Sequence, residues 1–194
     1  MVAKEERFAH TTYTLSRISS ADMTYTTESA STFSNRLNSS NQLADAVPAT
    51  VALFQRLSVD DQLALLWYAY TEMGHSITPA APGAARLQLA EGLLNQIKQM
   101  SHPEQLQVMR DLATKRNTAI SRAYGVLSTN TKLAFWYQLS EYMVQGIVVP
   151  MPPGYQPSRD VINVLNTIKQ LDFGQQITIL RNSVIDMGVD PLAE

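Results

Sequence analysis

Apolar positions in this chain recur at helical spacing from Asp45 onward. Val51, Phe54 and Leu57 fall on one side of a helix, and Asp45 and Pro48 suit its first turn. No later segment offers a run of strands. The pattern therefore predicts an all-α protein.

The next predicted helix has an unusually aromatic apolar face. The stretch 58–61 has the form of a capping box, which predicts that a helix opens there. Asp60 and Asp61 add the negative charge that a helix N-terminus favours. The apolar side chains that follow lie on one side of this helix or close to it: Leu63, Leu66, Trp67, Tyr70 and Met73.

Further helices are separated by short polar or glycine- and proline-containing stretches. Loops are expected at 74–83 and 101–103, and the last helix should end near Gly188. The remaining helices are expected at 86–100, 103–115, 118–127, 131–145, 159–171 and 174–187.

The chain also contains an internal duplication. Residues 94–112 align without gaps onto 165–183 at a constant offset of 71. The identical positions are Leu94, Asn95, Ile97, Lys98, Gln99, Gln105 and Arg110 in the first copy and Leu165, Asn166, Ile168, Lys169, Gln170, Gln176 and Arg181 in the second. Upstream of each stretch, a Trp-Tyr pair is followed by a glutamate five residues after the Trp: Trp67-Tyr68 with Glu72, and Trp136-Tyr137 with Glu141. Two copies of one helical unit therefore make up the predicted fold.

The first part of the chain has a different composition. Residues 9–42 contain 15 Ser or Thr and few apolar residues, so burial would gain too little to offset the entropy of ordering them. We therefore expect a flexible Ser/Thr-rich arm at 1–30 and one helical domain at 31–194.

Charge and composition exclude several function classes. Fifteen basic and 17 acidic residues leave a formal net charge of −2, so no basic field points to nucleic acid. The sequence has no cysteine, which excludes disulfides and thiolate metal sites. It shows neither a membrane span nor a secretory signal, so we expect a cytoplasmic protein.

No catalytic constellation is apparent in the sequence. His10, His75 and His102 lie far apart without metal-ligand spacing, and no glycine-rich phosphate loop is present. The sequence therefore predicts a protein that is not an enzyme.

The two tryptophans occupy equivalent places in the two copies. Each is either an ordinary core anchor or part of a groove for a planar apolar guest. The neighbouring residues favour the groove. Around Trp136 these are Leu133, Tyr137, Ser140 and Met143, which resemble the aromatic face around Trp67. A helix of 12 residues spans only about 18 Å, so a guest of roughly 25 Å would cross from one copy into the other. The two Trp-Tyr sites would then hold the two halves of that guest.

Five long motifs resemble the N-terminal domain of the orange carotenoid protein family and its free-standing relatives, the helical carotenoid proteins. They are DAVPATVALFQRLSVDDQLALLWYAYTEMG, AAPGAARLQLAE, KLAFWYQLSEYMVQG, PMPPGYQ and GQQITILRNSVIDMG. The resemblance implies two interleaved four-helix bundles that hold one ketocarotenoid, which would be canthaxanthin, echinenone or 3'-hydroxyechinenone. By matching motif positions, it implies that the pigment is lined by Leu63, Leu66, Trp67, Tyr70, Leu133, Trp136, Tyr137, Met143, Met151 and Tyr155, and bordered by Asp60, Gly83 and Met109.

The resemblance also implies partners and a physiological role. Arg181 matches the family arginine that meets a C-terminal domain or the phycobilisome, which makes a C-terminal-domain-like carotenoid carrier and the phycobilisome candidate partners. Gln138 stands where the family usually has a basic residue, and Arg110 where it often has a smaller one. The expected role is photoprotection in a cyanobacterium, near the thylakoid surface, by quenching singlet oxygen or by storing or carrying carotenoid. The alternative is a phycobilisome-binding quencher of antenna energy. Because residues 1–194 hold no second domain, we expect no reversible light switching.

Overall fold

The computed structural model describes residues 46–74 and 86–191, which are helical and contain no strand. They belong to one compact unit that spans Ser40–Glu194. The predicted arm at 1–30, its boundary at residue 31, and Gly83 lie outside the described residues. Within the described part, the all-α prediction is confirmed.

Each helix expected within the described residues is present. Residues 46–56 are helical. The later helices are α2 (Val59–Met73), α3 (Gln88–Lys98), α4 (His102–Ala113), α5 (Ala119–Gly125), α6 (Thr129–Val144), α7 (Arg159–Lys169) and α8 (Phe173–Ile185). Across 46–74 and 86–191, no helix is both long and apolar enough to span a membrane.

Side-chain caps fix where the helices begin. The Ser58 hydroxyl accepts a hydrogen bond from the Asp61 backbone N–H at the start of α2. This is one of the two hydrogen bonds that make up the predicted capping box. Ser128 caps α6 in the same way through Thr131, so this helix begins at Thr129 and not at the predicted residue 131. A full capping box is present instead at Ser101 and Glu104, which places His102 inside α4.

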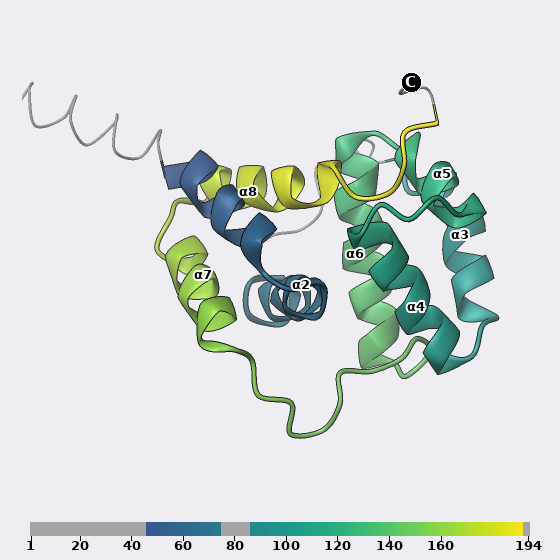
Figure 1. Cartoon of the computed structure of the whole chain (residues 1–194), viewed down its shortest axis with the longest axis horizontal. Coiled ribbons are helices and arrows are strands. Elements are labelled where there is room, and N and C mark those ends of the chain that lie inside the picture. The colour runs from purple at the N-terminus through teal and green to yellow at the C-terminus, as the bar shows by residue number, and fades with distance from the viewer. Residues whose placement is uncertain (1–45, 75–85, 192–194) are drawn as a thin grey trace, which may run out of the picture. The chain divides into compact units, whose positions relative to one another are not determined.

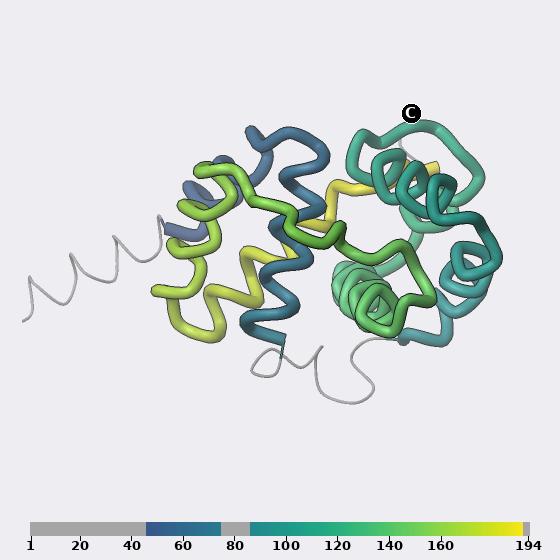
Figure 2. Tube along the Cα trace, turned by 90° about the horizontal axis from the view of Figure 1, so that it is seen from below, coloured from purple at the N-terminus to yellow at the C-terminus, as the bar shows by residue number. Residues whose placement is uncertain are grey.

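The helices form two groups, and each group contains helices from both copies of the duplicated sequence (Figure 1). One group contains helix 46–56, α2, α7 and α8, and the other contains α3, α4, α5 and α6 (Figure 2). Helix α2 of the first copy packs against α7 of the second, and α6 of the second copy packs against α3 of the first. Contacts of α2 with α4 and of α6 with α8 then join the two groups. The interleaved arrangement follows because each copy completes the other's bundle.

The end of α8 is anchored on the opposite group. The Gly188 N–H donates to the Leu112 carbonyl (2.8 Å) and the Val189 N–H to the Ser121 carbonyl (3.0 Å). Gly188 has φ +77, and a Cβ there would lie 2.6 Å from the Tyr124 ring, so both the turn and the close approach require glycine. The ammonium group of buried Lys132 donates to the Ile185 carbonyl (2.6 Å).

Candidate functional site

Two adjoining apolar cavities lie where the two helix groups meet. The first, here the aromatic cavity, has about 450 Å³ of empty space, part of it open to solvent, between α2, α6 and α8. The second, here the loop cavity, has about 770 Å³ between α2, α4, α6 and the proline-containing loop that follows α6. Leu66, Trp136 and Ser140 line both cavities, so the two share a wall. Both volumes include space that is open to solvent.

The structure brings together the predicted pigment-lining residues that it describes. The aromatic cavity contains Leu66, Tyr70, Leu133, Trp136 and Tyr137. The loop cavity contains Asp60, Leu63, Leu66, Trp67, Met109, Trp136, Met143, Met151 and Tyr155. Arg181 borders neither cavity.

Sequence reasoning did not assign several residues of the cavity walls to the site. They are Ala64, Ala69, Gly74, Leu106, Arg110, Val149, Pro150, Pro152 and Leu180. Ser140, which the sequence analysis placed beside Trp136, lines both cavities. Small residues within one turn of an aromatic side chain were a usable signal for Ala64 and Ala69, because they leave room for a guest. Arg110 and Leu180 gave no such signal, since their position depends on how α4 and α8 pack against the opposite group.

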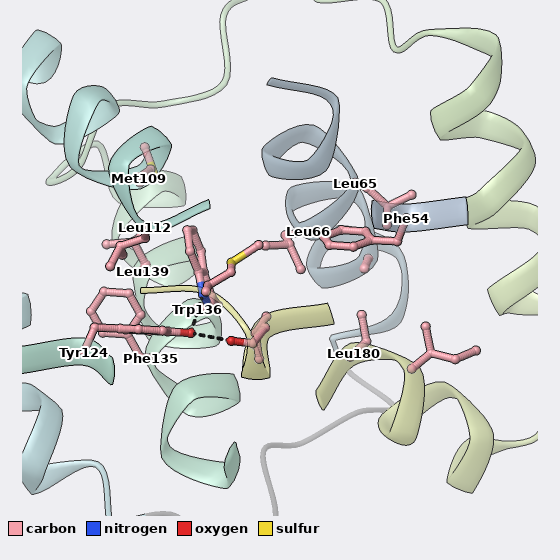
Figure 3. Packing of buried hydrophobic residues seen from close by; sticks show 14 of the residues in the cluster. Phe54, Leu65, Leu66, Met109, Leu112, Tyr124, Phe135, Trp136, Leu139 and Leu180 are labelled. Carbon is pink, nitrogen blue, oxygen red and sulfur yellow. Dashed lines mark hydrogen bonds between the residues drawn. The ribbon is translucent and has the colours of Figure 1, made fainter. Parts of the chain in front are cut away.

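Trp136 is held rigidly between the two cavities. Its side chain is 5% exposed, and its ring packs edge-on against Phe135 at 5.8 Å between centroids. The indole N–H donates to the Tyr124 hydroxyl (3.0 Å), which donates to the Val184 carbonyl (3.1 Å) (Figure 3). This chain of bonds ties a wall of both cavities to the end of α8.

Trp67 has a different environment, although it occupies the equivalent place in the first copy. It is half-buried, it lines only the loop cavity, and its indole N–H has no hydrogen bond among the described residues. Its ring lies 6.1 Å from that of Tyr70. Both tryptophans therefore face the loop cavity, which differs from the expectation of one Trp-Tyr site for each half of a guest.

Two tyrosines line the aromatic cavity, and a glutamate outside its lining binds one of them. The Tyr70 and Tyr137 rings meet edge-to-face with centroids 5.2 Å apart, and the Tyr70 hydroxyl donates to the Glu141 carboxylate. Burial first, and then the bond to Glu141, raise the pKa of Tyr70 well above its usual range. Burial and the nearby Glu141 charge also raise the pKa of Tyr137. Both phenols therefore stay neutral at physiological pH.

The equivalent glutamate of the first copy has a structural role instead. Glu72 forms an ion pair with Lys169, which links α2 to α7. The equivalent lysine, Lys98, lies 4.8 Å from the centre of the Tyr142 ring and leaves Glu141 to Tyr70. The duplicated glutamates thus bind a lysine of α7 in one copy and a tyrosine that lines the aromatic cavity in the other.

The loop cavity has a polar rim. The Arg110 guanidinium donates to both carboxylate oxygens of Asp60, at 2.7 and 2.9 Å, and this bond holds the pKa of Asp60 below its usual value. The Tyr68 hydroxyl donates to the Tyr155 carbonyl at 3.5 Å. The Val149 N–H donates to the buried Gln105 side chain at 2.7 Å, which fixes the start of the loop.

Arg181, the predicted partner-binding residue, lies on α8 and is half-buried. Its Nε atom is buried and has no hydrogen-bond partner within the described part of the chain. No group of three or more metal-ligating side chains gathers in residues 46–74 and 86–191.

The fold and the cavities define an all-helical protein with a largely apolar, aromatic-walled binding site. A family model described as the orange carotenoid protein N-terminal domain matches residues 40–190. The chain belongs to this family.

Relatives and solved structures agree with the family assignment. An orange carotenoid-binding domain-containing protein of Nostoc sp. (strain PCC 7120) is 70% identical over 173 residues, which are 89% of this chain and 100% of that protein. The Anabaena (Nostoc) sp. PCC 7120 orange carotenoid protein binding canthaxanthin matches with a TM-score of 0.70 and 58% identity, over 76% of this chain and 48% of that one. The Red Carotenoid Protein of the same organism, also binding canthaxanthin, matches with a TM-score of 0.67 and 43% identity, over 73% of this chain and 97% of that one. The chain thus spans about half the length of the orange carotenoid protein that it matches.

Proposed function

We propose that this protein binds one carotenoid molecule that passes through both cavities. The observation that carries the proposal is the wall shared by the two cavities, which Leu66, Trp136 and Ser140 form together. A rod-shaped polyene would lie along apolar and aromatic side chains on both sides of this wall. Burying about forty carbon atoms would supply roughly 12 kcal/mol at about 0.3 kcal/mol per heavy atom, which is enough for binding to survive purification.

The proposed ligand is a ketocarotenoid, with canthaxanthin as the first candidate. Two of the solved relatives are described as binding canthaxanthin. The cavity walls are mainly apolar, with a few polar groups at their ends, and this suits a long hydrocarbon chain with oxygen at its end rings.

The proposed physiological role is photoprotection. A long conjugated polyene accepts excitation energy from singlet oxygen and releases it as heat, so a bound carotenoid quenches this species without being consumed. The same binding site would also store the pigment or carry it. Singlet-oxygen lifetimes measured with holoprotein and with apoprotein test the quenching role.

A second role, docking on a phycobilisome or on a C-terminal-domain-like carotenoid carrier, is proposed for Arg181. A guanidinium offers a fork of donors to a carboxylate, and Arg181 is only half-buried on α8, so part of its side chain is open to solvent. Antenna fluorescence recorded with added holoprotein tests docking on the phycobilisome. Loss of quenching in Arg181→Met, with pigment content unchanged, would support it.

We also propose that the 194-residue polypeptide alone keeps one spectral form in light. A reversible switch requires two arrangements of similar free energy that light populates differently. Both cavities are lined by residues of a single compact unit, Ser40–Glu194. A reversible red shift of the monomeric holoprotein under blue-green light would contradict this proposal.

Expression in a carotenoid-producing host, with a variant that fills the shared wall, tests the binding proposal directly. Ser140→Leu places a larger side chain where the cavities meet, so pigment retention should fall several-fold, and Ser140→Val should give a smaller loss. Ser183→Leu is the matched control, because Ser183 is also buried (5% exposed) but borders neither cavity. Colourless wild-type protein with normal helical circular dichroism would contradict the proposal.

A further inference from the structure

Among the residues that line either cavity in the described part of the chain, Asp60 and Arg110 alone carry formal charge. Both belong to the loop cavity, where α2 and α4 form its rim. An ion pair in the wall of an otherwise apolar cavity calls for an explanation, because its contribution to stability at an exposed site is small.

Donors of Arg110 remain available beside the cavity. Its Nε and Nη2 atoms bind Asp60, and the side chains of Arg110 and Asp60 are 40% and 59% exposed. A guanidinium has five N–H donors in a planar fork, so about three remain free of the carboxylate. Asp60 fixes the plane of this fork and thereby orients the remaining donors.

The second copy lacks this arrangement. Arg181 is the counterpart of Arg110, but an uncharged residue, Thr129 or Asn130, stands where the first copy has Asp60. Arg181 also borders neither cavity. The ion pair therefore belongs to one end of the binding site and is not a general feature of the duplicated unit.

The opposite end of the site offers fewer donors. The Tyr70 hydroxyl in the aromatic cavity is already bound to Glu141. An end-ring oxygen buried without a donor would lose its hydrogen bonds to water, whereas a hydrocarbon ring would lose none. A ligand with a ring oxygen therefore gains most at the rim that holds Arg110.

We propose that Arg110, oriented by Asp60, is a specificity-determining residue that donates a hydrogen bond to an oxygen atom on one end ring of the bound carotenoid. This inference rests on the proposed function, since it assigns the selectivity of the same site. It makes the domain prefer a carotenoid with an end-ring carbonyl to the hydrocarbon of the same length.

The test compares loading with canthaxanthin and with β-carotene in competition. Arg110→Met removes the donors but keeps an aliphatic side chain. It should lower the preference for canthaxanthin about fivefold, as expected for a hydrogen bond to a charged group that is partly exposed. Arg110→Lys should keep part of the preference. Asp60→Asn should lower the preference less than Arg110→Met, because Arg110 keeps its donors and loses only the carboxylate that orients them. Uptake of β-carotene, which has no ring oxygen, should fall less than uptake of canthaxanthin in each variant, so the ratio of the two reports the loss of the donor.

Arg116→Met provides the matched control. Arg116 and Asp111 form another Arg–Asp ion pair, 3.7 Å apart, and neither residue borders a cavity. This variant should load both carotenoids as the wild type does. Infrared spectra add a readout that a purely structural role would not change, because loss of a donor raises the C=O stretching frequency of bound canthaxanthin in Arg110→Met but not in Arg116→Met.

Two results would overturn the inference, and only one of them would also overturn the proposed function. If the wild type binds both carotenoids and the preference and C=O frequency are the same in Arg110→Met and Arg116→Met, the inference fails and the proposed function stands. If the wild type binds neither carotenoid, both fail together.

Discussion

Trp67 and Trp136 stand at the same point of two copies of one helical unit, yet they differ in burial and in bonding. Trp136 is buried, and its indole N–H is bound to Tyr124, whereas Trp67 is half-buried and lacks such a bond among the described residues. The reason lies one helix earlier, because the first copy has Phe54 where the second has Tyr124. Both of these side chains are almost fully buried, but only the tyrosine has a hydroxyl.

The same divergence is visible in the paired glutamines of the two copies. Gln105 is 1% exposed, and its side chain binds backbone groups before α4 as well as Ile147 and Val149 of the loop that follows α6. Among the described residues, Gln176 binds the carbonyls of Ile168 and Leu171 before its own helix, and it is half-buried. Both glutamines therefore hold the local turn before their helix, and Gln105 also supports the rim of the loop cavity.

Replacing each tryptophan by leucine should give the largest difference between the copies. Trp136→Leu removes a buried ring and the bond to Tyr124, so we expect the free energy of unfolding of the apoprotein to fall by about 3 kcal/mol. Trp67→Leu should cost about 1 kcal/mol, because its ring is half-exposed. Urea unfolding followed by circular dichroism measures both values.

Pigment retention should fall in both tryptophan variants, since both rings line the loop cavity. Equal losses of stability would show that the two environments do not differ as described. Unchanged pigment yield and spectrum in both variants would make the tryptophans ordinary core residues.

The glutamines should show the next largest difference. Gln105→Leu removes a buried amide and leaves the partly buried Val149 N–H without its acceptor, so it should cost about 2 kcal/mol. Gln176→Leu should cost about 1 kcal/mol, because Gln176 is only half-buried. Only the first variant should also speed pigment loss, because the loop cavity loses the anchor of its rim. Equal pigment release from the two variants would argue against this role of Gln105.

Tyr124→Phe should make the second copy resemble the first. We expect a loss of about 1 kcal/mol near neutral pH, because the Trp136 N–H loses its acceptor. Burial raises the pKa of Tyr124 above the ordinary value of 10.0, so its contribution to stability is full below pH 10 and is lost as the pH rises through the folded-state value.

The unfolding free energy of the wild type should therefore decline above pH 10, and Tyr124→Phe should decline less steeply. Some decline should persist in the variant, since the pKa values of Tyr70, Tyr137 and Tyr155 are also raised. Parallel pH curves for the two proteins would contradict the assignment.

The Asp60–Arg110 ion pair should give the smallest effect on stability. Both side chains are substantially exposed, so Asp60→Asn should cost about 0.5 kcal/mol or less in the apoprotein. The lowered pKa of Asp60 means that this contribution is present above its ordinary value of 3.8 and is lost as the pH falls through the folded-state value. A loss above about 2 kcal/mol at neutral pH would mark the pair as structural and not as part of the rim.

Helix order and the shared framework could be predicted from the sequence because they depend on local signals. Apolar periodicity located α2 and α6, and the repeated motifs around Lys98 and Lys169 revealed the duplication before any packing was known. Boundaries were less certain: Ser128 starts α6 earlier than the apolar pattern indicated, because a cap acts before the first apolar residue.

The inequality between the copies could not be predicted in the same way. The Tyr124–Trp136 bond joins α5 to α6, and the Asp60–Arg110 pair joins α2 to α4, so both depend on packing between helices. Arg110 has an identical counterpart in Arg181, and nothing in either local sequence indicates that only the former lines a cavity. Pairings of this kind become visible only once the helices are placed in space.

The ratio of carotenoid to protein in holoprotein, measured by absorbance after gel filtration of material from a carotenoid-producing host, tests most directly whether the two unequal copies form one site. A single polyene that crosses the wall formed by Leu66, Trp136 and Ser140 predicts one carotenoid per chain. A ratio near two would mean that each cavity holds its own ligand, and a ratio near zero in folded protein would mean that neither cavity binds carotenoid.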